Sequence, residues 1–145
     1  MIHIEQSIVV KRPIEEVFVF AAHPENNPKW WPGVLEDKLL TAGPIQKGTR
    51  FREIAKEPWG TIEHIAEMTV YEPPRQMAYK AVSGPLPAEV TETFEPVEGG
   101  TRVTITVHVQ SRGLLKLLKP LMRRTLRQTL QGNLVTLQRL LEARP

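Results

Sequence analysis

The chain has 145 residues, of which 41% are hydrophobic and 24% are charged, and it contains no cysteine. This length is typical of one globular domain, and we expect residues 1–145 to form a single domain. The lack of cysteine excludes disulfides, thiolate nucleophiles and cysteine-ligated metals. The amino-terminal residues show no signal-peptide pattern, and no run of about 18 apolar residues occurs, so we expect a cytoplasmic protein.

The net charge of +3 is distributed unevenly along the chain. Residues 1–98 hold 10 basic and 15 acidic residues, whereas residues 99–145 hold 9 basic residues and 1 acidic residue. A basic surface attracts nucleic acid or anionic lipid, although most such charge runs are simply solvated. The charge alone therefore leaves the partner open.

The first third of the chain predicts one strand and two short helical elements. Ile2–Val10 alternates apolar and polar residues with the period of a strand. Pro13 then begins a short helix, because a proline costs no hydrogen bond at the first helical position. A second short element starts at Pro24, and two further prolines keep it short. It presents Trp30 and Trp31 on a constrained turn, where we expect one ring to join the core.

From Leu35 to Gln110 the sequence alternates between apolar-polar runs and turn signals rich in glycine and proline. The intervals are too short for crossover helices, so they predict an antiparallel meander with one buried face. The predicted strands are Arg50–Lys56, Thr61–Tyr71, Met77–Val82, Glu89–Pro96 and Thr101–Val109.

The residues after Gly113 change to the helical period, and a long helix is predicted over Leu114–Glu142. Pro120 is expected either to kink this helix or to mark its true first turn. An isolated helix cannot bury its apolar stripe, so we expect the stripe to pack on the open face of the sheet. The stripe consists of Leu118, Met122, Leu126, Leu130, Leu134, Leu137 and Leu141.

The order of these elements resembles the START-like (Bet v 1-like, SRPBCC) superfamily, which includes bacterial polyketide cyclase/dehydrase-like proteins. The segments that carry the resemblance are IVVKRPIEEVFVFAAHPENNPKWWPGV, QKGTRF, EPPRQMAY and FEPVEGGTRVTI. The resemblance implies an α+β helix-grip fold, in which a curved antiparallel sheet of about seven strands wraps around the C-terminal helix. It also implies an elongated apolar cavity between the sheet and that helix.

The alternation along the strands predicts which side chains face such a cavity. The expected apolar faces hold Phe51, then Ile62, Ala66, Met68 and Val70, then Met77, Tyr79 and Ala81, and finally Val90 and Phe94. Glu53, His64, Tyr79 and Glu92 are polar residues on these faces. The predicted ligand-binding residues are Trp30, Trp31, Phe51, Glu53, Met68, Tyr79, Phe94, Leu118, Met122, Leu126 and Leu130. A single β-bulge would reverse the inward and outward sets of a strand.

Two functions are compatible with this pattern. The first is binding of a hydrophobic small molecule such as a lipid, isoprenoid or polyketide, because apolar walls with a few polar groups are typical of ligand sites. The second is a cofactor-free cyclase or dehydratase, in which His64 and Glu92 are the candidate catalytic residues. We favour binding, since no unambiguous catalytic set is present.

Other kinds of site have little support in the sequence. The four histidines lack metal-ligand spacing, no phosphate-binding or nucleophile-elbow motif occurs, and we expect neither metal nor cofactor. No nucleic-acid-binding motif is present. The basic face of the C-terminal helix leaves open a weak contact with an anionic membrane or a protein partner. The oligomeric state is undetermined.

Overall fold

The computed structural model describes residues 2–57, 60–85, 87–110 and 117–145. Its elements follow the predicted order, and the strands end within two residues of the predicted limits where limits were given. They are β1 Ile2–Val10, α1 Ile14–Ala21, η1 Pro24–Asn26, α2 Asn27–Trp30, β2 Val34–Leu39, β3 Arg50–Glu57, β4 Gly60–Glu72, β5 Gln76–Ser83, β6 Ala88–Val97, β7 Gly100–Val109 and α3 Lys119–Glu142.

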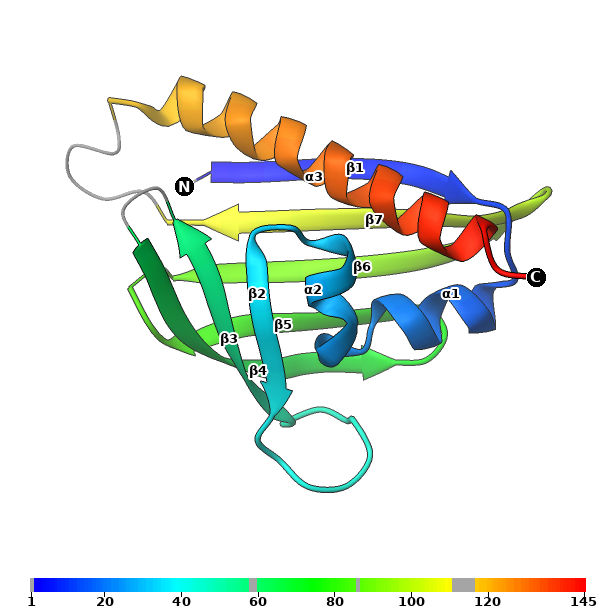
Figure 1. Cartoon of the computed structure of the whole chain (residues 1–145), viewed down its shortest axis with the longest axis horizontal. Coiled ribbons are helices and arrows are strands. Elements are labelled where there is room, and N and C mark those ends of the chain that lie inside the picture. The colour runs from blue at the N-terminus through cyan, green and yellow to red at the C-terminus, as the bar shows by residue number, and fades with distance from the viewer. Residues whose placement is uncertain (1, 58–59, 86, 111–116) are drawn as a thin grey trace.

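The seven strands form one antiparallel sheet in the order β1-β7-β6-β5-β4-β3-β2. Strands β2 to β7 are a meander, and β1 closes the other side by pairing with the last strand. The sheet curls into a half-barrel, with α1, α2 and α3 on its concave side (Figure 1). The predicted α+β helix-grip class is therefore confirmed, including the two short helical elements after the first strand.

β-Bulges decide which side chains point into the half-barrel, and the register shifts at one place between β2 and β3 and at two places between β4 and β5. In β2 the register shifts between Val34 and Glu36, so that Val34 and Asp37 are buried. In β4 the register shifts between Met68 and Val70. Val70 consequently lies opposite Ala78 on the outer face, whereas Tyr71 lies opposite the buried Met77. The expectation that Val70 faces the interior is thus wrong, because a bulge reverses all later positions of a strand.

The core fills the space between the concave face of the sheet and the helices. Phe18 of α1 contacts Phe94 of β6 and Tyr71 of β4, with ring centroids 5.1 and 5.5 Å apart. Trp30 of α2 is fully buried beside these elements. The short helices thus cover one part of the sheet, and α3 covers another.

The long helix begins at Lys119, later than predicted, and Pro120 lies in its first turn. The predicted positions 114–116 lie outside the described residues. The second half of the helix carries the buried part of the stripe, Leu130, Leu134, Leu137 and Leu141. Met122 and Leu126 are only partly buried, and Leu118 is exposed. No helix among the described residues is long and apolar enough to cross a membrane.

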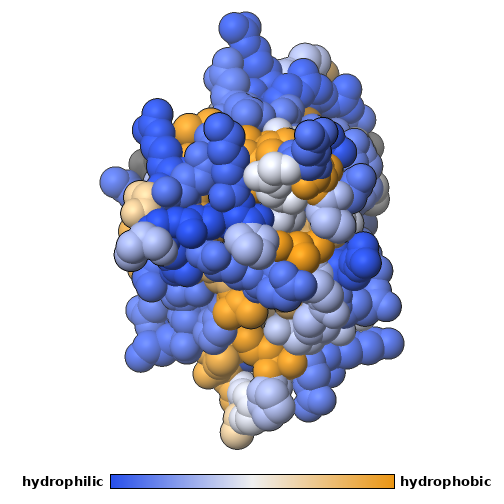
Figure 2. All heavy atoms as spheres, turned by 90° about the vertical axis from the view of Figure 1, so that its right-hand side faces the viewer, coloured by the Kyte–Doolittle hydropathy of each residue, from blue (hydrophilic) through white to orange (hydrophobic). Residues whose placement is uncertain are grey.

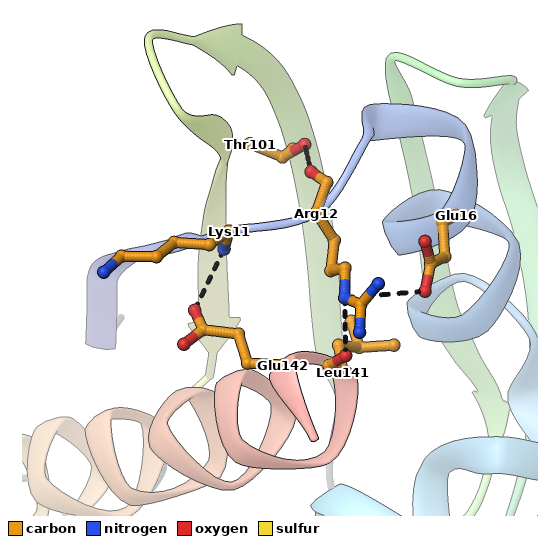
Figure 3. Close-up of polar contacts among 6 residues, drawn as sticks. All are labelled: Lys11, Arg12, Glu16, Thr101, Leu141 and Glu142. Carbon is orange, nitrogen blue, oxygen red and sulfur yellow. Dashed lines mark hydrogen bonds and ion pairs between the residues drawn. The ribbon is translucent and has the colours of Figure 1, made fainter. Parts of the chain in front are cut away.

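The carboxyl end of α3 is fixed to the turn between β1 and α1 (Figure 3). Arg12 Nε donates a hydrogen bond to the Leu141 carbonyl oxygen at 3.0 Å, and the Lys11 amide donates to Glu142 Oε2 at 2.9 Å. Thr101 Oγ1 of β7 in turn donates to the Arg12 carbonyl oxygen at 2.8 Å. A last-turn carbonyl of the helix, which has no partner within the helix, is satisfied in this way.

The end of the molecule that carries α1 and the C-terminus is covered mostly by hydrophilic residues, with smaller hydrophobic patches between them (Figure 2). The candidate site described below lies at the opposite end of the half-barrel, where β3 and β5 end and β4 and β6 begin (Figure 1).

Candidate functional site

A cavity of about 180 Å³ lies inside the half-barrel. Its wall is formed by residues of β2 to β7 together with Asn27 and Trp31 of the α2 segment. The apolar part of the wall includes Ala55, Ile62, Ala66, Ala81, Val90 and Val109. Alanine occurs repeatedly in this wall, and the short side chains leave space that larger residues would fill.

Three ionisable side chains share this wall: Glu53, His64 and Tyr79. Glu53 of β3 and His64 of β4 are directly opposed in the antiparallel ladder. Opposed residues project from the same face with Cβ atoms about 5 Å apart, so this pair is held together by the strands themselves. All three groups were predicted from strand alternation to face the interior, and the register places them there.

Asp37 adds a second carboxyl group next to this pair. It lies directly opposite Glu53 on β2 and is almost completely buried. Asn27 Nδ2 donates a hydrogen bond to Asp37 Oδ2 at 2.9 Å, while Oδ1 has no partner among the described residues. Asp37, Glu53 and His64 therefore form a row across three neighbouring strands.

Burial raises the pKa values of both carboxyl groups in this row. The pKa of Asp37 rises to about 8, mainly through desolvation and further through the nearby Glu53 and Glu25, although the Asn27 hydrogen bond opposes the shift. Desolvation raises the pKa of Glu53 to about 7. Two carboxyl groups that titrate near neutrality are able to donate as well as accept hydrogen bonds.

Glu92 of β6 is a third buried carboxyl group, deeper in the half-barrel. It is fully buried, neither of its oxygens has a hydrogen-bond partner among the described residues, and desolvation raises its pKa to about 8. No ion pair in the described part of the chain involves Asp37, Glu53 or Glu92. The pKa of Tyr79 is raised by its burial and by all three carboxyl groups, so the phenol is neutral.

The two candidate catalytic residues are not neighbours in the sheet. Glu92 lies opposite Met77 on β5, and Met77 lies opposite Tyr71 on β4. Tyr71 is seven residues along β4 from His64, whereas Glu53 is directly opposite His64. The register therefore brings Glu53, rather than Glu92, next to the histidine.

The backbone of Gly84 fixes one side of the His64 ring. Gly84 has φ +120°, and a Cβ atom at this position would lie only 2.3 Å from His64 Nδ1. A side chain would be strained at this φ and would also collide with the imidazole. Glycine is thus required here both for the backbone conformation of the turn and for the position of the His64 ring.

The arrangement is suited to proton transfer. Among the described residues, no group of histidine, aspartate and glutamate side chains could hold a metal ion. A neutral carboxyl group beside an imidazole, in an apolar cavity, is able to polarise a carbonyl oxygen or exchange a proton with it.

The sequence matches the family model described as polyketide cyclase/dehydrase and lipid transport over residues 1–142. The chain belongs to this family. The predicted resemblance to the START-like, Bet v 1-like superfamily is thereby confirmed. No curated protein matches the sequence.

Several solved structures share the fold of this chain. A protein from Thermus thermophilus has a TM-score of 0.80 and 18% identity, with 94% of each chain covered. A protein from Deinococcus radiodurans has a TM-score of 0.75 and 19% identity, with 97% of each chain covered. The di-domain ARO/CYC BexL from the BE-7585A biosynthetic pathway has a TM-score of 0.73 and 21% identity, over 96% of this chain and 46% of BexL. At these identities the likeness concerns the fold alone.

The other predicted ligand-binding residues occupy four kinds of position in this family member. Five lie in the core: Trp30, Phe51, Met68, Phe94 and Leu130. Met122 and Leu126 are partly buried on α3, and Leu118 is exposed. Trp31 contributes to the cavity wall, and Trp30 is the ring that joins the core.

Sequence reasoning missed Asp37 and Asn27. Simple alternation from Val34 would turn Glu36 inward, and only the bulge in β2 turns Asp37 inward instead. The one available signal was the pair of adjacent acidic residues between the apolar ends of the strand, which does not reveal which of the two is buried.

Proposed function

We propose that this protein binds a small hydrophobic molecule in the cavity of the half-barrel, with a carbonyl or hydroxyl oxygen of the ligand directed toward Glu53, His64 and Tyr79. The observation that carries the proposal is the apolar cavity with these three ionisable groups in its wall. Apolar walls with a few convergent polar groups are the usual composition of a ligand site. The cytoplasm as the location of this activity, and residues 1–145 as one domain, remain predictions from the sequence.

The volume of the cavity limits the size of the bound group. At about 180 Å³ it is close to an engineered cavity of about 150 Å³ that binds benzene, and smaller than most drug-sized sites. A ligand therefore places one ring, or a short branched alkyl end, against the alanine-rich wall. A larger isoprenoid or polyketide would leave its remaining part outside.

Titration with a neutral single-ring compound, p-cresol, tests this proposal by NMR chemical-shift changes. We expect saturable shifts at Trp31 and Tyr79, both of which lie in the wall. The variant Ala81→Leu fills the cavity and should weaken binding by about 10-fold or more, since the added atoms occupy the ligand space. Ala78→Leu places the same group on the outer face of the same strand and should leave binding unchanged. Equal weakening in both variants, or no saturation, would refute the proposal.

A second candidate function, acid–base catalysis of ring closure, is favoured by the direct opposition of Glu53 and His64. In an intramolecular aldol condensation, a base removes a proton from the carbon next to a carbonyl group. The resulting enolate carbon attacks a second carbonyl carbon, and the product then loses water. One of the paired residues would take the carbon-bound proton and the other would protonate the carbonyl oxygen. Chemistry of this kind needs no cofactor.

Heptane-2,6-dione is a substrate of suitable size, because its cyclisation yields a six-membered enone and water, and the enone absorbs in the ultraviolet. We expect slow turnover in the wild-type protein that falls at least about 100-fold in His64→Ala, the usual range for a general base. His108→Ala removes a histidine on the outer face near His3 and should retain the activity. If the wild-type protein binds p-cresol but does not convert heptane-2,6-dione, the binding function is supported and the catalytic one is not.

A further inference from the structure

Three leucines are exposed together at the beginning of α3. Leu117, Leu118 and Leu121 have 80%, 51% and 62% of their surface exposed. Leu117 and Leu118 directly precede α3, with Leu118 as its N-cap residue, and Leu121 lies in the first turn of the helix. Full burial on the sheet side begins only at Leu130, so much of the surface of these three leucines, which we call the leucine end, is left uncovered by the described residues.

Basic residues follow the leucine end directly in the chain. Lys119, Arg123, Arg124 and Arg127 follow it within the first nine residues of α3. None of them forms an ion pair with a residue that the structure describes, and the sequence has no acidic residue between Glu98 and Glu142. Apolar side chains beside unpaired cations are the composition of helices that lie in the interface of anionic membranes.

The fold holds α3 firmly at its other end. The hydrogen bonds from Arg12 and Lys11 fix Leu141 and Glu142 to the turn between β1 and α1. The leucine end lies at the opposite end of the helix, on the same side of the molecule as the ends of β3 and β7 (Figure 1). The cavity wall includes Ala55 and Val109 from those strand ends, so the leucine end lies at the cavity end of the half-barrel.

We propose that the leucine end docks the protein on the surface of an anionic lipid bilayer. The three leucines enter the interfacial region, while the four basic side chains contact the headgroup phosphates. A symmetric contact with a second copy of the chain is less favourable, because it would bring the same cations of both copies together. Docking in this orientation brings the cavity end of the half-barrel toward the membrane. The proposal does not depend on what the cavity binds.

Co-sedimentation with lipid vesicles tests the proposal on the full chain. The probes are vesicles of phosphatidylcholine alone and vesicles with about 30% phosphatidylglycerol. We expect partitioning onto the anionic vesicles to exceed that onto the neutral ones by at least about 10-fold and to decrease with added salt. Equal partitioning onto both vesicles would overturn the proposal.

Two pairs of variants separate the apolar and the electrostatic contributions. Arg123→Glu/Arg124→Glu should reduce partitioning by at least about 10-fold, because each cation near an anionic surface increases the binding constant severalfold. Lys47→Glu/Arg75→Glu changes the net charge equally at exposed loop positions and should reduce it by less than about threefold. Leu118→Gln/Leu121→Gln should also release the protein, whereas Leu35→Gln, at a leucine that is likewise 51% exposed, should not.

Two further outcomes decide the matter. Equal losses in the test and control variants would overturn the proposal. It would also be overturned if the wild type did not bind vesicles but formed a dimer in solution that Leu118→Gln/Leu121→Gln dissociates. All substituted side chains are exposed or half-buried, so we expect each variant to fold, and a thermal unfolding curve checks this. Ala81→Leu, which fills the cavity, should leave vesicle binding unchanged and so separates this proposal from the one on the ligand.

Discussion

Glu53 on β3 and His64 on β4 are directly opposed in the antiparallel ladder, and both side chains belong to the wall of the same cavity. Asp37 continues this row on the neighbouring strand β2. The row places a carboxyl group with a pKa near 7 beside an imidazole, in surroundings that are otherwise apolar. Ligand affinity and stability should therefore both depend on pH.

The affinity for a neutral apolar ligand should decrease as the pH rises through about 7. Desolvation raises the pKa of Glu53 to about 7, and a ligand that displaces water from the cavity desolvates the carboxyl group further. The ligand therefore prefers the protonated protein, and we expect the Kd for p-cresol to rise about 10-fold between about pH 7 and about pH 9. Glu53→Gln should remove this dependence. Glu63→Gln, which changes an exposed neighbour of His64, should preserve it.

The buried Glu92 should make the protein less stable at alkaline pH. Its pKa is about 8 in the folded protein and near 4.5 in the unfolded chain, so the folded state binds more protons between these values. The free energy of unfolding consequently falls as the pH rises through this window, by about 3 kcal/mol between about pH 6 and about pH 8.5. Asp37, whose pKa is also raised to about 8, contributes with the same sign.

Urea unfolding of Glu92→Gln measures the share of this one residue. The variant should have a flatter pH dependence than the wild type and should be more stable than the wild type at about pH 8.5. Glu89→Gln removes an exposed carboxyl group from the same strand and should follow the wild-type curve. A wild-type stability that increases from about pH 6 to about pH 8.5 would contradict the prediction.

Gly84→Ala should disturb the histidine as well as the backbone. The new Cβ atom would lie 2.3 Å from His64 Nδ1, so the ring must move. Gly43→Ala is a matched control, since Gly43 also has a positive φ, +90°, but nothing lies within 4 Å of a Cβ atom there. We expect each variant to lose about 1 kcal/mol of stability from backbone strain. Only Gly84→Ala should shift the His64 ring resonances and weaken p-cresol binding. The prediction is contradicted if the His64 ring resonances are the same in both variants.

Arg12→Ala should loosen the carboxyl end of α3. The variant loses the hydrogen bond from Arg12 Nε to the Leu141 carbonyl oxygen, which then lacks its charged donor. A hydrogen bond from a charged group contributes about 2 kcal/mol, which corresponds to a decrease in Tm of about 5 °C for a chain of this size. Arg102→Ala, which removes only an exposed ion pair to Glu95 at 3.7 Å, should change Tm by less than about 1 °C. Hydrogen exchange in the last turn of α3 should increase only in Arg12→Ala.

Much of this protein follows from its sequence, because periodicity is a local property that burial imposes on each element. The alternation in Ile2–Val10 and Thr101–Val109 predicted two strands that the structure pairs residue by residue. The helical stripe ending at Leu141 predicted a helix packed on the sheet. The same alternation was sufficient to place Glu53, His64 and Tyr79 inside, since the pairing of β3 with β4 is unbroken from Arg50 to Glu57 and that of β5 with β6 from Gln76 to Lys80.

Only the tertiary structure decided which acidic residues meet. The bulge in β2 turns Asp37 toward Glu53, and the bulge in β4 exchanges Val70 for Tyr71 on the inner face. A bulge arises where a strongly curved sheet must bend, and it depends on the neighbouring strands rather than on the local sequence. The pairing of His64 with Glu53 rather than Glu92 likewise depends on register across strands distant in sequence. The sequence by itself therefore determined the elements and their inward faces, whereas register and curvature assembled the site.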